Sequence, residues 1–409
     1  MSLSRRTFIS SLPIMIGSMT IPTLPNFDAS DWTKIKALYD IDKYPYLHLN
    51  SGSAGIMPTA VRLQLEQVID QLNQNPPYEI WDGLVKIRED NRNRLADIIG
   101  AKASEVTVVR NTTEAINLIV HGTSVSSNDR IVCASSDYPY AVGSCKMLAK
   151  KHQADLTIIP LDDIDTVSDD EIIERYRNNL NAGAKLLVLS HMSFREGRIL
   201  PVKEITQIAH ENGAKVLLDA AHTYCHIDHD VKELGIDYYA TSLHKWLTAP
   251  HGSGLLYISE EEIEAINPPL SLIDEDKGIE KFSHLGTRAF QNEVGINYAL
   301  TFQEEIGLKK KRKRLRKLTD YWTNQVEDLP NIRFHTPRTK GKYGAVSAFS
   351  INRIGTNKLL KTLQDDYQIH AKPSGYPGKG FIRITPNLFT LESDLDHLVA
   401  SIKDISSQY

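Results

Sequence analysis

The alternation of short apolar runs with amphipathic segments between Val61 and Ile258 constrains this chain more than any other feature of its sequence. Strands that are apolar throughout are typical of parallel sheets whose two faces are covered by helices. The pattern therefore predicts an α/β fold around a mostly parallel, seven-stranded sheet. The expected strands are Glu105–Arg110, Arg130–Ala134, Leu156–Pro160, Lys185–Ser190, Lys215–Asp219, Tyr238–Thr241 and Gly254–Ile258, and the expected helices include Thr113–His121, Tyr140–Lys151, Asp169–Asn181 and Val202–Asn212.

The pattern changes after about Leu300. We expect a long charged helix over Phe302–Leu329 and an amphipathic helix from Leu391 to Ile405, with Thr390 as its cap. Between them lie the strand-like pieces Ile332–His335, Ala345–Asn352 and Gly380–Ile384. We therefore predict a large domain at 61–300, a smaller C-terminal α/β domain at 301–409, and a segment at 26–60 that joins the small domain.

The composition is that of an ordinary globular protein: 41% of the 409 residues are hydrophobic, 24% are charged, and the formal net charge is −4. No excess of basic charge points to nucleic acid. The dense basic run from Lys309 to Lys317 is punctuated by leucines at helical spacing. We expect it on the solvent-facing side of one helix rather than in a binding patch. Cys133, Cys145 and Cys225 form no CxxC pair, and no metal site is expected.

The first 25 residues differ in kind from the rest. Arg5 and Arg6 are followed by Thr-Phe-Ile and a short apolar stretch from Ile9 to Met19, too short to span a bilayer as a helix. This resembles a twin-arginine export signal at residues 1–25; the alternative is a disordered terminus with a chance arginine pair. No clear Ala-x-Ala cleavage site follows. We expect a periplasmic or exported protein without stable membrane insertion, or otherwise a cytoplasmic one.

One lysine stands directly after a predicted strand, in the uncharged run Ser242-Leu243-His244-Lys245-Trp246. Burying an ammonium group there costs free energy, so the pKa of Lys245 should fall and its neutral amine should become available. A neutral amine is what a lysine needs to form a Schiff base with a carbonyl group. Most lysines near strand ends are surface groups, so this fragment alone does not identify Lys245 as a Schiff-base lysine.

An aspartate ends the apolar strand Lys215–Asp219. A buried carboxylate needs a partner, and enzymes that use pyridoxal phosphate (PLP) place an acidic residue at the pyridine nitrogen of the cofactor. The alternatives for Asp219 are a helix cap or a metal ligand. His222 follows shortly after and could reach the ring hydroxyl, although a lone histidine is more often structural.

Thr112 and Thr113 stand where another strand runs into a helix. Free backbone amides, the helix dipole and two hydroxyls make a phosphate site, and ordinary N-capping by threonine is the alternative.

In this order and spacing, the three fragments resemble the class V aminotransferase family of fold-type I PLP enzymes, over about residues 45 to 405. The similarity is strongest to the isopenicillin N epimerase-like branch, which is related to the cysteine desulfurases. The motifs that carry it are Ser242–Trp246, Ala249-Pro250, Gly252-Ser253-Gly254 and Leu285-Gly286-Thr287-Arg288.

The resemblance implies PLP as the cofactor, with Lys245 as the lysine that carries it, Asp219 at its ring nitrogen and His222 at its ring hydroxyl. It implies that Tyr138 stacks on the ring and that Arg383 binds the substrate carboxylate. The implied phosphate contacts are Thr112, Thr113, Ser242 and His244, together with Gly286 and Thr287 of a second subunit, and hence a homodimer with a shared site. Arg195 is a candidate second anion contact, with an exposed arginine at a helix start as the alternative.

Two departures from the family pattern matter. Desulfurases carry a mobile cysteine shortly before the carboxylate arginine, but Ile369–Gly380 contains none, so persulfide chemistry is not expected. In addition, Phe194 stands where relatives often place a small or amide residue.

We therefore expect a PLP-dependent enzyme that acts at Cα or Cβ of an amino acid or an amino-acid-derived amine, of the aminotransferase or epimerase type. No second base for epimerisation can be identified. The alternatives are a C–S or other β-lyase and a non-catalytic PLP-fold binding protein. A nicotinamide-dependent oxidoreductase is disfavoured, because no glycine-rich turn follows an early strand.

Overall fold

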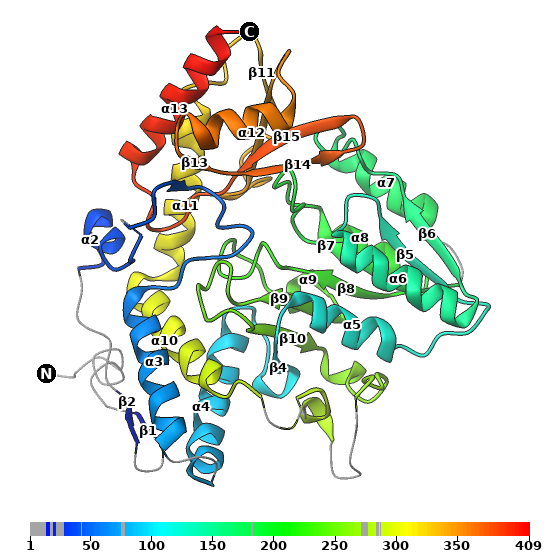
Figure 1. Ribbon diagram of the computed structural model, residues 1–409. Coiled ribbons are helices and arrows are strands. Elements are labelled where there is room, and N and C mark those ends of the chain that lie inside the picture. The colour runs from blue at the N-terminus through cyan, green and yellow to red at the C-terminus, as the bar shows by residue number, and fades with distance from the viewer. Residues whose placement is uncertain are drawn as a thin grey trace, which may run out of the picture.

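The computed structural model describes residues 14–16, 19–21, 28–41, 43–74, 78–180, 183–270, 277–283, 286 and 288–409. Figure 1 shows a lower part built around the larger sheet and an upper part that carries the C-terminus. This α/β architecture is the one predicted from the sequence.

The larger sheet has seven strands in the order β4-β10-β9-β8-β7-β5-β6. β10 runs antiparallel to both of its neighbours, β4 and β9, and every other pair of neighbouring strands is parallel, so the prediction of a mostly parallel seven-stranded sheet is confirmed. The connection from β9 to β10 is too short for a crossover, and the chain therefore turns back. The strands are β4 (Val106–Val109), β5 (Arg130–Ala134), β6 (Asp155–Ile159), β7 (Ala184–Ser190), β8 (Lys215–Asp219), β9 (Tyr238–Ser242) and β10 (Gly254–Ile258).

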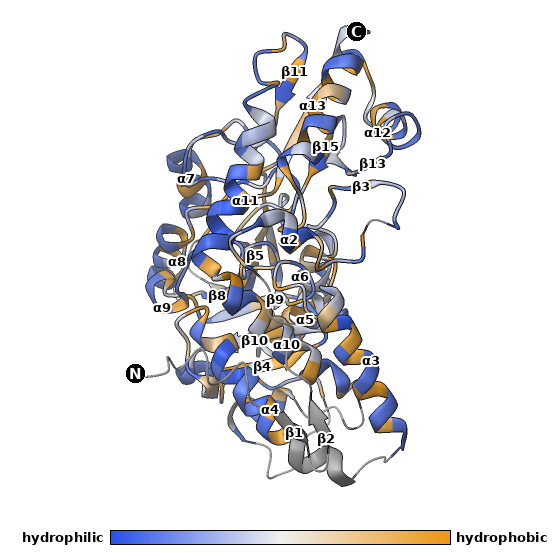
Figure 2. Ribbon diagram, turned by 90° about the vertical axis from the view of Figure 1, so that its left-hand side faces the viewer, coloured by the Kyte–Doolittle hydropathy of each residue, from blue (hydrophilic) through white to orange (hydrophobic). Residues whose placement is uncertain are grey.

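Helices bury both faces of this sheet, which explains why its strands are apolar throughout. Along β7, Leu186 and Val188 belong to the core under α5 and α6, whereas Leu187 and Leu189 belong to the core on the opposite face. In Figure 2, helices such as α3 and α7 carry blue and orange residues in alternation, as expected of helices with one wet face. The helices of this part are α3 (Thr59–Gln74), α4 (Tyr78–Asp97), α5 (Thr112–Gly122), α6 (Pro139–His152), α7 (Asp169–Asn179), α8 (Val202–Glu211), α9 (Val231–Leu234) and α10 (Gln291–Ile306).

The upper part contains a four-stranded antiparallel sheet in the order β11-β12-β15-β14 and its own apolar core. Residues near the N-terminus join it, because β3 (Leu47–His48) pairs with β13 (Ile369–His370). The division into domains at 26–60, 61–300 and 301–409 stays a prediction. The other elements are α2 (Trp32–Lys36), α11 (Leu308–Thr323), β11 (Ile332–Phe334), β12 (Ser347–Ile351), α12 (Thr356–Asp365), β14 (Lys372–Tyr376), β15 (Lys379–Ile384) and α13 (Glu392–Ser407).

Two details of the C-terminal prediction are wrong. The single helix expected over Phe302–Leu329 is two helices, because Gly307 lies between α10 and α11 with a φ of 85°, which glycine adopts far more easily than other residues. Thr390 does not cap the last helix: its hydroxyl accepts a hydrogen bond from the Asn387 amide, and Leu391 is the N-cap residue.

The basic run of α11 is also less exposed than expected. Lys311 and Arg314 are buried. Lys311 Nζ donates to the backbone carbonyl oxygen of Trp246 and to Oε1 of the Gln303 side chain, and Arg314 forms an ion pair with Glu392. These two long side chains thus bind groups that neighbouring elements bring to the inner face of the helix, which sequence periodicity does not reveal.

Most of the proposed export signal lies outside the described residues. Within it, the backbone of β1 (Ile14–Ile16) pairs antiparallel with that of β2 (Met19–Ile21). Across the described part of the chain, every helix is too short or too polar to cross a membrane.

Candidate active site

A cavity of about 560 Å³ lies beyond the carboxyl ends of the parallel strands, where ligands bind in sheets of this kind. Asp219 is the last residue of β8, Ser242 is the last residue of β9, and Thr112 begins the helix that follows β4. The topology therefore brings together the three sequence fragments that looked most informative. The predicted residues that line this cavity are Thr112, Thr113, Tyr138, Asp219, His222, Ser242, His244, Lys245 and Arg383.

Lys245 supplies a buried amine. Burial lowers its pKa to about 8, although the charge of Asp219 partly opposes this shift. Its Nζ lies 3.5 Å from Nε2 of His222, and no described carboxylate forms an ion pair with it. The neutral, nucleophilic amine is therefore a minor species at pH 7 and about half of the population near pH 8.

The backbone around Lys245 is held from two sides. The Gly55 amide donates to the carbonyl oxygen of His244 at 2.9 Å, and a Cβ atom at Gly55 would lie 2.2 Å from the carbonyl oxygen of Lys245. Only glycine permits that approach. On the other side, Lys311 donates to the Trp246 carbonyl, and the His226 ring stacks on Trp246 at 3.8 Å between centroids.

Asp219 and His222 form the polar floor of the cavity. Oδ1 of Asp219 accepts a hydrogen bond from the Ala221 amide at 3.0 Å. Burial raises the pKa of Asp219, while this hydrogen bond and the charge of Lys245 act against the rise. The pKa of His222 lies well below its usual value, first through burial and then through the positive charges of Lys245 and Arg383. His222 is therefore a neutral imidazole.

A helix start forms one end of the cavity. The Thr112 amide donates to Oγ of Ser242 at 3.0 Å, and the two hydroxyl oxygens lie 2.7 Å apart. Burial, followed by the charges of Lys245 and His251, lowers the pKa of the nearby His244 to about 4. Hydroxyl groups and the positive end of the α5 dipole thus face a common space, which suits a phosphate group.

The cavity also contains a buried guanidinium. Arg383 donates to the Phe194 carbonyl at 2.7 Å and to Oγ of Ser53 at 2.9 Å. Burial lowers its pKa to about 10, and no described carboxylate pairs with it. Since an unpaired buried charge is costly, this arrangement fits a guest carboxylate. The Tyr138 ring lies in the same cavity and makes an edge-to-face contact with the Phe194 ring, with 5.2 Å between the ring centroids.

Two of the described residues that were predicted for the site, Arg195 and Gly286, do not line the cavity. The Arg195 guanidinium lies between the rings of Phe194 and Tyr376, at 4.2 and 4.4 Å, and donates to the Ser136 carbonyl instead. Gly286 is exposed and does not line the cavity, and Thr287 lies outside the described residues. A contribution of Gly286 and Thr287 to a partner's site stays a prediction.

The sequence prediction missed several cavity residues. Asn50 and Ser53 hold Arg383, although they lie more than three hundred residues away in the chain. Lys372 and Tyr140 also line the cavity. Nothing local in the sequence marks Asn50, Ser53 and Lys372, because they follow β3 or begin β14 and reach the site only through the tertiary structure. Tyr140 is different: it lies on α6, two residues after the predicted Tyr138.

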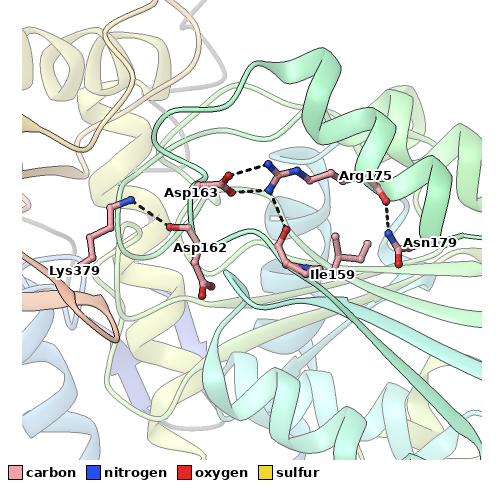
Figure 3. A pocket seen from close by; sticks show the side chains of 7 residues that line it. Ile159, Asp162, Asp163, Arg175, Asn179 and Lys379 are labelled. Atoms are coloured by element: carbon pink, nitrogen blue, oxygen red, sulfur yellow. Dashed lines mark hydrogen bonds and ion pairs between the residues drawn. The ribbon is translucent and has the colours of Figure 1, made fainter.

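A second cavity, of about 650 Å³, is lined by charged residues that already satisfy one another (Figure 3). Asp163 binds Arg175 through two hydrogen bonds, and Lys379 donates to the Asp162 carbonyl. By contrast, Nδ1 of His222, Nδ1 of His244 and Nε of Arg383 are buried without a hydrogen-bond partner. These unpartnered atoms around Lys245 mark the first cavity as the ligand site.

The residues present fit PLP. A phosphate fits the Thr112 helix start, an aldehyde fits the Lys245 amine, and a protonated ring nitrogen fits Asp219. The fold and this set of side chains define the class of fold-type I PLP enzymes. Residues 48–376 match the model of the family Aminotransferase class-V, and the chain belongs to that family. The protein is accordingly an enzyme.

Several characterised proteins are similar to this chain. Isopenicillin N epimerase of Streptomyces clavuligerus is 25% identical, over 93% of this chain and 99% of the relative. A probable cysteine desulfurase of Synechocystis is 26% identical, over 80% and 81%. Among solved structures, a mutant of C-DES with glycine covalently linked to its PLP cofactor has a TM-score of 0.82 and 20% identity, over 90% of this chain and 99% of that one. Cysteine desulfurase from Thermococcus onnurineus has a TM-score of 0.80 and 22% identity, over 92% and 98%.

Proposed function

We propose that this protein is a PLP-dependent enzyme that acts at Cα or Cβ of an amino acid or an amino-acid-derived amine. The observation that carries the proposal is the half-buried Lys245, whose amine has a lowered pKa, in one cavity with a strand-end carboxylate and a guanidinium that pairs with no described carboxylate. Aminotransferase or epimerase chemistry is favoured, and the similarity to isopenicillin N epimerases supports the second of these.

When bound, PLP supplies an electron sink for a bond broken at Cα. Thr112, Thr113, Ser242 and His244 would hold its phosphate. Asp219 would keep a proton at the ring nitrogen, and Arg383 would orient the substrate through its carboxylate. The Lys245 amine, with a pKa of about 8, can take a proton from Cα and return it.

The final destination of that proton separates the possible reactions. Its return to the opposite face of Cα would give epimerisation, and its delivery to the cofactor would give transamination. If a β-substituent leaves instead, the reaction is that of a lyase. A C–S or other β-lyase is the alternative proposal. Desulfurase activity is not proposed, because Ile369–Gly380 lacks cysteine and the three cysteines of the chain are buried elsewhere.

The test is to supplement the purified protein with PLP, record its absorbance and reduce it with borohydride. We expect a yellow chromophore and a reduced adduct that peptide mass spectrometry locates at Lys245. The Lys245→Ala variant should lack both, and a Lys361→Met control on the exposed surface of α12 should keep them. A colourless protein, or an adduct elsewhere, would overturn the proposal. Spectral titration with amino acids and small peptides, followed by mass spectrometry of the products, would then identify the reaction.

A homodimer with a shared site is part of the same proposal. Gly286 is exposed, and Tyr140 and Met147 expose 67% and 65% of their surface on α6. Tyr140 and Met147 are two helical turns apart and so share one face of α6, and an exposed apolar patch on this face supports an interface. Light scattering should give twice the mass of one chain, and a monomer that retains full cofactor binding would contradict this part.

Export by the twin-arginine route is also proposed, on the Arg5-Arg6 pair. Cell fractionation should find the protein outside the cytoplasm. The double variant Arg5→Lys, Arg6→Lys should stay inside, and a wild-type protein found only in the cytoplasm would contradict export.

A further inference from the structure

Two cations face each other across the hairpin of β14 and β15. In the antiparallel register Lys372 is the direct partner of Arg383, and both residues line the active-site cavity. Directly opposed residues lie on the same face of a sheet, and like charges in such a pair destabilise it. The pair therefore favours an anion between or beside the two side chains.

The protein itself supplies no such anion among its described residues. Neither Lys372 nor Arg383 forms an ion pair with a described carboxylate, and Asp219 is the one carboxylate among the described residues that line the cavity. Lys379, at the other end of the same hairpin, differs: it forms an ion pair with Asp165 and donates to the Asp162 carbonyl. The hairpin is thus fixed near its turn through Lys379, whereas Lys372 has no carboxylate partner among the described residues.

The two cations lie at different depths. Arg383 is 3% exposed and is fixed by Phe194, Ser53 and Asn50, whereas Lys372 is an exposed residue. Lys372 therefore lies toward the mouth of the cavity. If the α-carboxylate of a substrate binds Arg383, its side chain would extend toward the mouth of the cavity. There the flexible Lys372 side chain could reach it.

We propose that the substrate carries a second carboxylate on its side chain and that Lys372 binds it, so that the enzyme prefers α-amino dicarboxylates or amines derived from them. This inference rests on the proposed function of the cavity. It names Lys372 as a specificity-determining residue, distinct from the groups that bind the cofactor.

The test is a spectral titration of the PLP-loaded protein with length-matched pairs of ligands. Aspartate, glutamate and 2-aminoadipate are compared with 2-aminobutyrate, norvaline and norleucine, each as both enantiomers. We expect tighter binding of the dicarboxylates. Lys372→Met should weaken that binding about fivefold without affecting the neutral ligands, as expected for one exposed ion pair. Lys372→Arg should restore the preference, Lys372→Glu should reverse it, and Lys361→Met on α12 should leave it unchanged. High salt should reduce the preference.

The possible outcomes separate this inference from the proposed function. An equal loss for dicarboxylic and neutral ligands in Lys372→Met would mean that Lys372 assists Arg383 at the α-carboxylate, and it would overturn the inference. So would weaker retention of PLP in that variant. If the wild-type protein forms its adduct at Lys245 but shows no preference for dicarboxylates, the inference fails and the proposed function stands. If no adduct forms at all, the proposed function itself fails.

Discussion

At the scale of single residues, the side chains that line the active-site cavity carry more positive than negative charge, with one carboxylate among them. Arg383 is buried and Lys245 is half-buried, and Asp219 is the only buried acid that lines the cavity within the described chain. Burial and mutual repulsion lower the pKa values of Lys245 and His222. The positive charges in this site repel one another, and a bound anion offsets that repulsion. The site therefore suits a phosphate-bearing cofactor and a carboxylate substrate.

The first prediction concerns the pH at which Lys245 becomes reactive. In the cofactor-free protein, the rate of chromophore formation with PLP should rise with pH around a midpoint near 8, because burial lowers the pKa of this amine from 10.5. Asp219→Asn should move the midpoint to lower pH, since the carboxylate is the group that raises this pKa. Stopped-flow absorbance measures both midpoints. A midpoint near 10 in the wild-type protein would contradict the buried environment.

At the scale of secondary elements, the β14–β15 hairpin shows why part of the site was not predictable. Pro373 and Gly375 interrupt the strand pattern of Lys372–Tyr376, and the surrounding sequence resembles a loop. The structure accommodates them because β14 is the edge strand of its sheet, where proline is tolerated. Gly375 has a φ of 139°, and a Cβ atom there would lie 2.1 Å from the Lys379 carbonyl oxygen. The glycine at 375 therefore allows β14 to pair closely with β15, and this pairing places Lys372 opposite Arg383.

The second prediction concerns the contact of α11 with the chain after Lys245. Lys311→Met should reduce the free energy of unfolding by about 1–3 kcal/mol, because the Trp246 carbonyl and Gln303 lose a buried donor. It should also weaken PLP binding, since Trp246 follows Lys245 directly. Lys313→Met, on the exposed side of the same helix, should change stability by less than about 0.5 kcal/mol. Denaturant titration and equilibrium dialysis of PLP measure the two effects.

The sign of the pH dependence provides a further check on Lys311. Burial lowers its pKa to about 8 from 10.5, so between these values the unfolded chain binds more protons than the folded one. The contribution of Lys311 to stability therefore rises with pH across this window. The rise should be smaller in Lys311→Met, and an identical pH profile in variant and wild type would contradict the assignment.

At the scale of the whole molecule, one carboxylate joins the two parts that enclose the site. Figure 1 shows the β14–β15 hairpin extending from the upper part toward α7. There Asp165, whose side chain is 1% exposed, binds Nδ1 of His335 at 2.9 Å and also pairs with Lys379 and Arg333. Burial alone would raise the pKa of Asp165, but the hydrogen bonds from His335 and Lys379 outweigh it and bring the pKa to about 2. The hairpin that carries Arg383 is thus fixed to the larger part.

The third prediction tests this contact. Asp165→Asn should reduce the free energy of unfolding at pH 7 by about 1–3 kcal/mol, because the buried His335 ring and the partly exposed Lys379 and Arg333 lose an anionic partner. Asp163→Asn, which breaks a more exposed pair with Arg175, should cost less than about 1 kcal/mol.

The pH dependence of the same variant follows from the lowered pKa. Asp165 contributes stability above its ordinary pKa of 3.8, and that contribution is lost as the pH falls through about 2. The difference between wild type and Asp165→Asn should therefore shrink from pH 4 to pH 2 in thermal or denaturant unfolding. A difference that stays constant over this range would rule out the proposed ion-pair network.

The sequence by itself determined the class of fold and the residues at the ends of its parallel strands. The apolar runs and helix starts that predict Lys245, Asp219 and Thr112 are local patterns, and parallel strands bring their carboxyl ends to one edge without further information. The tertiary structure alone decided which distant groups meet there. The pairing of Lys372 with Arg383, the burial of Lys311 and the turn of Arg195 toward Ser136 depend on contacts between segments far apart in the chain. Periodicity reports which side of an element is buried, and only packing determines what that side touches.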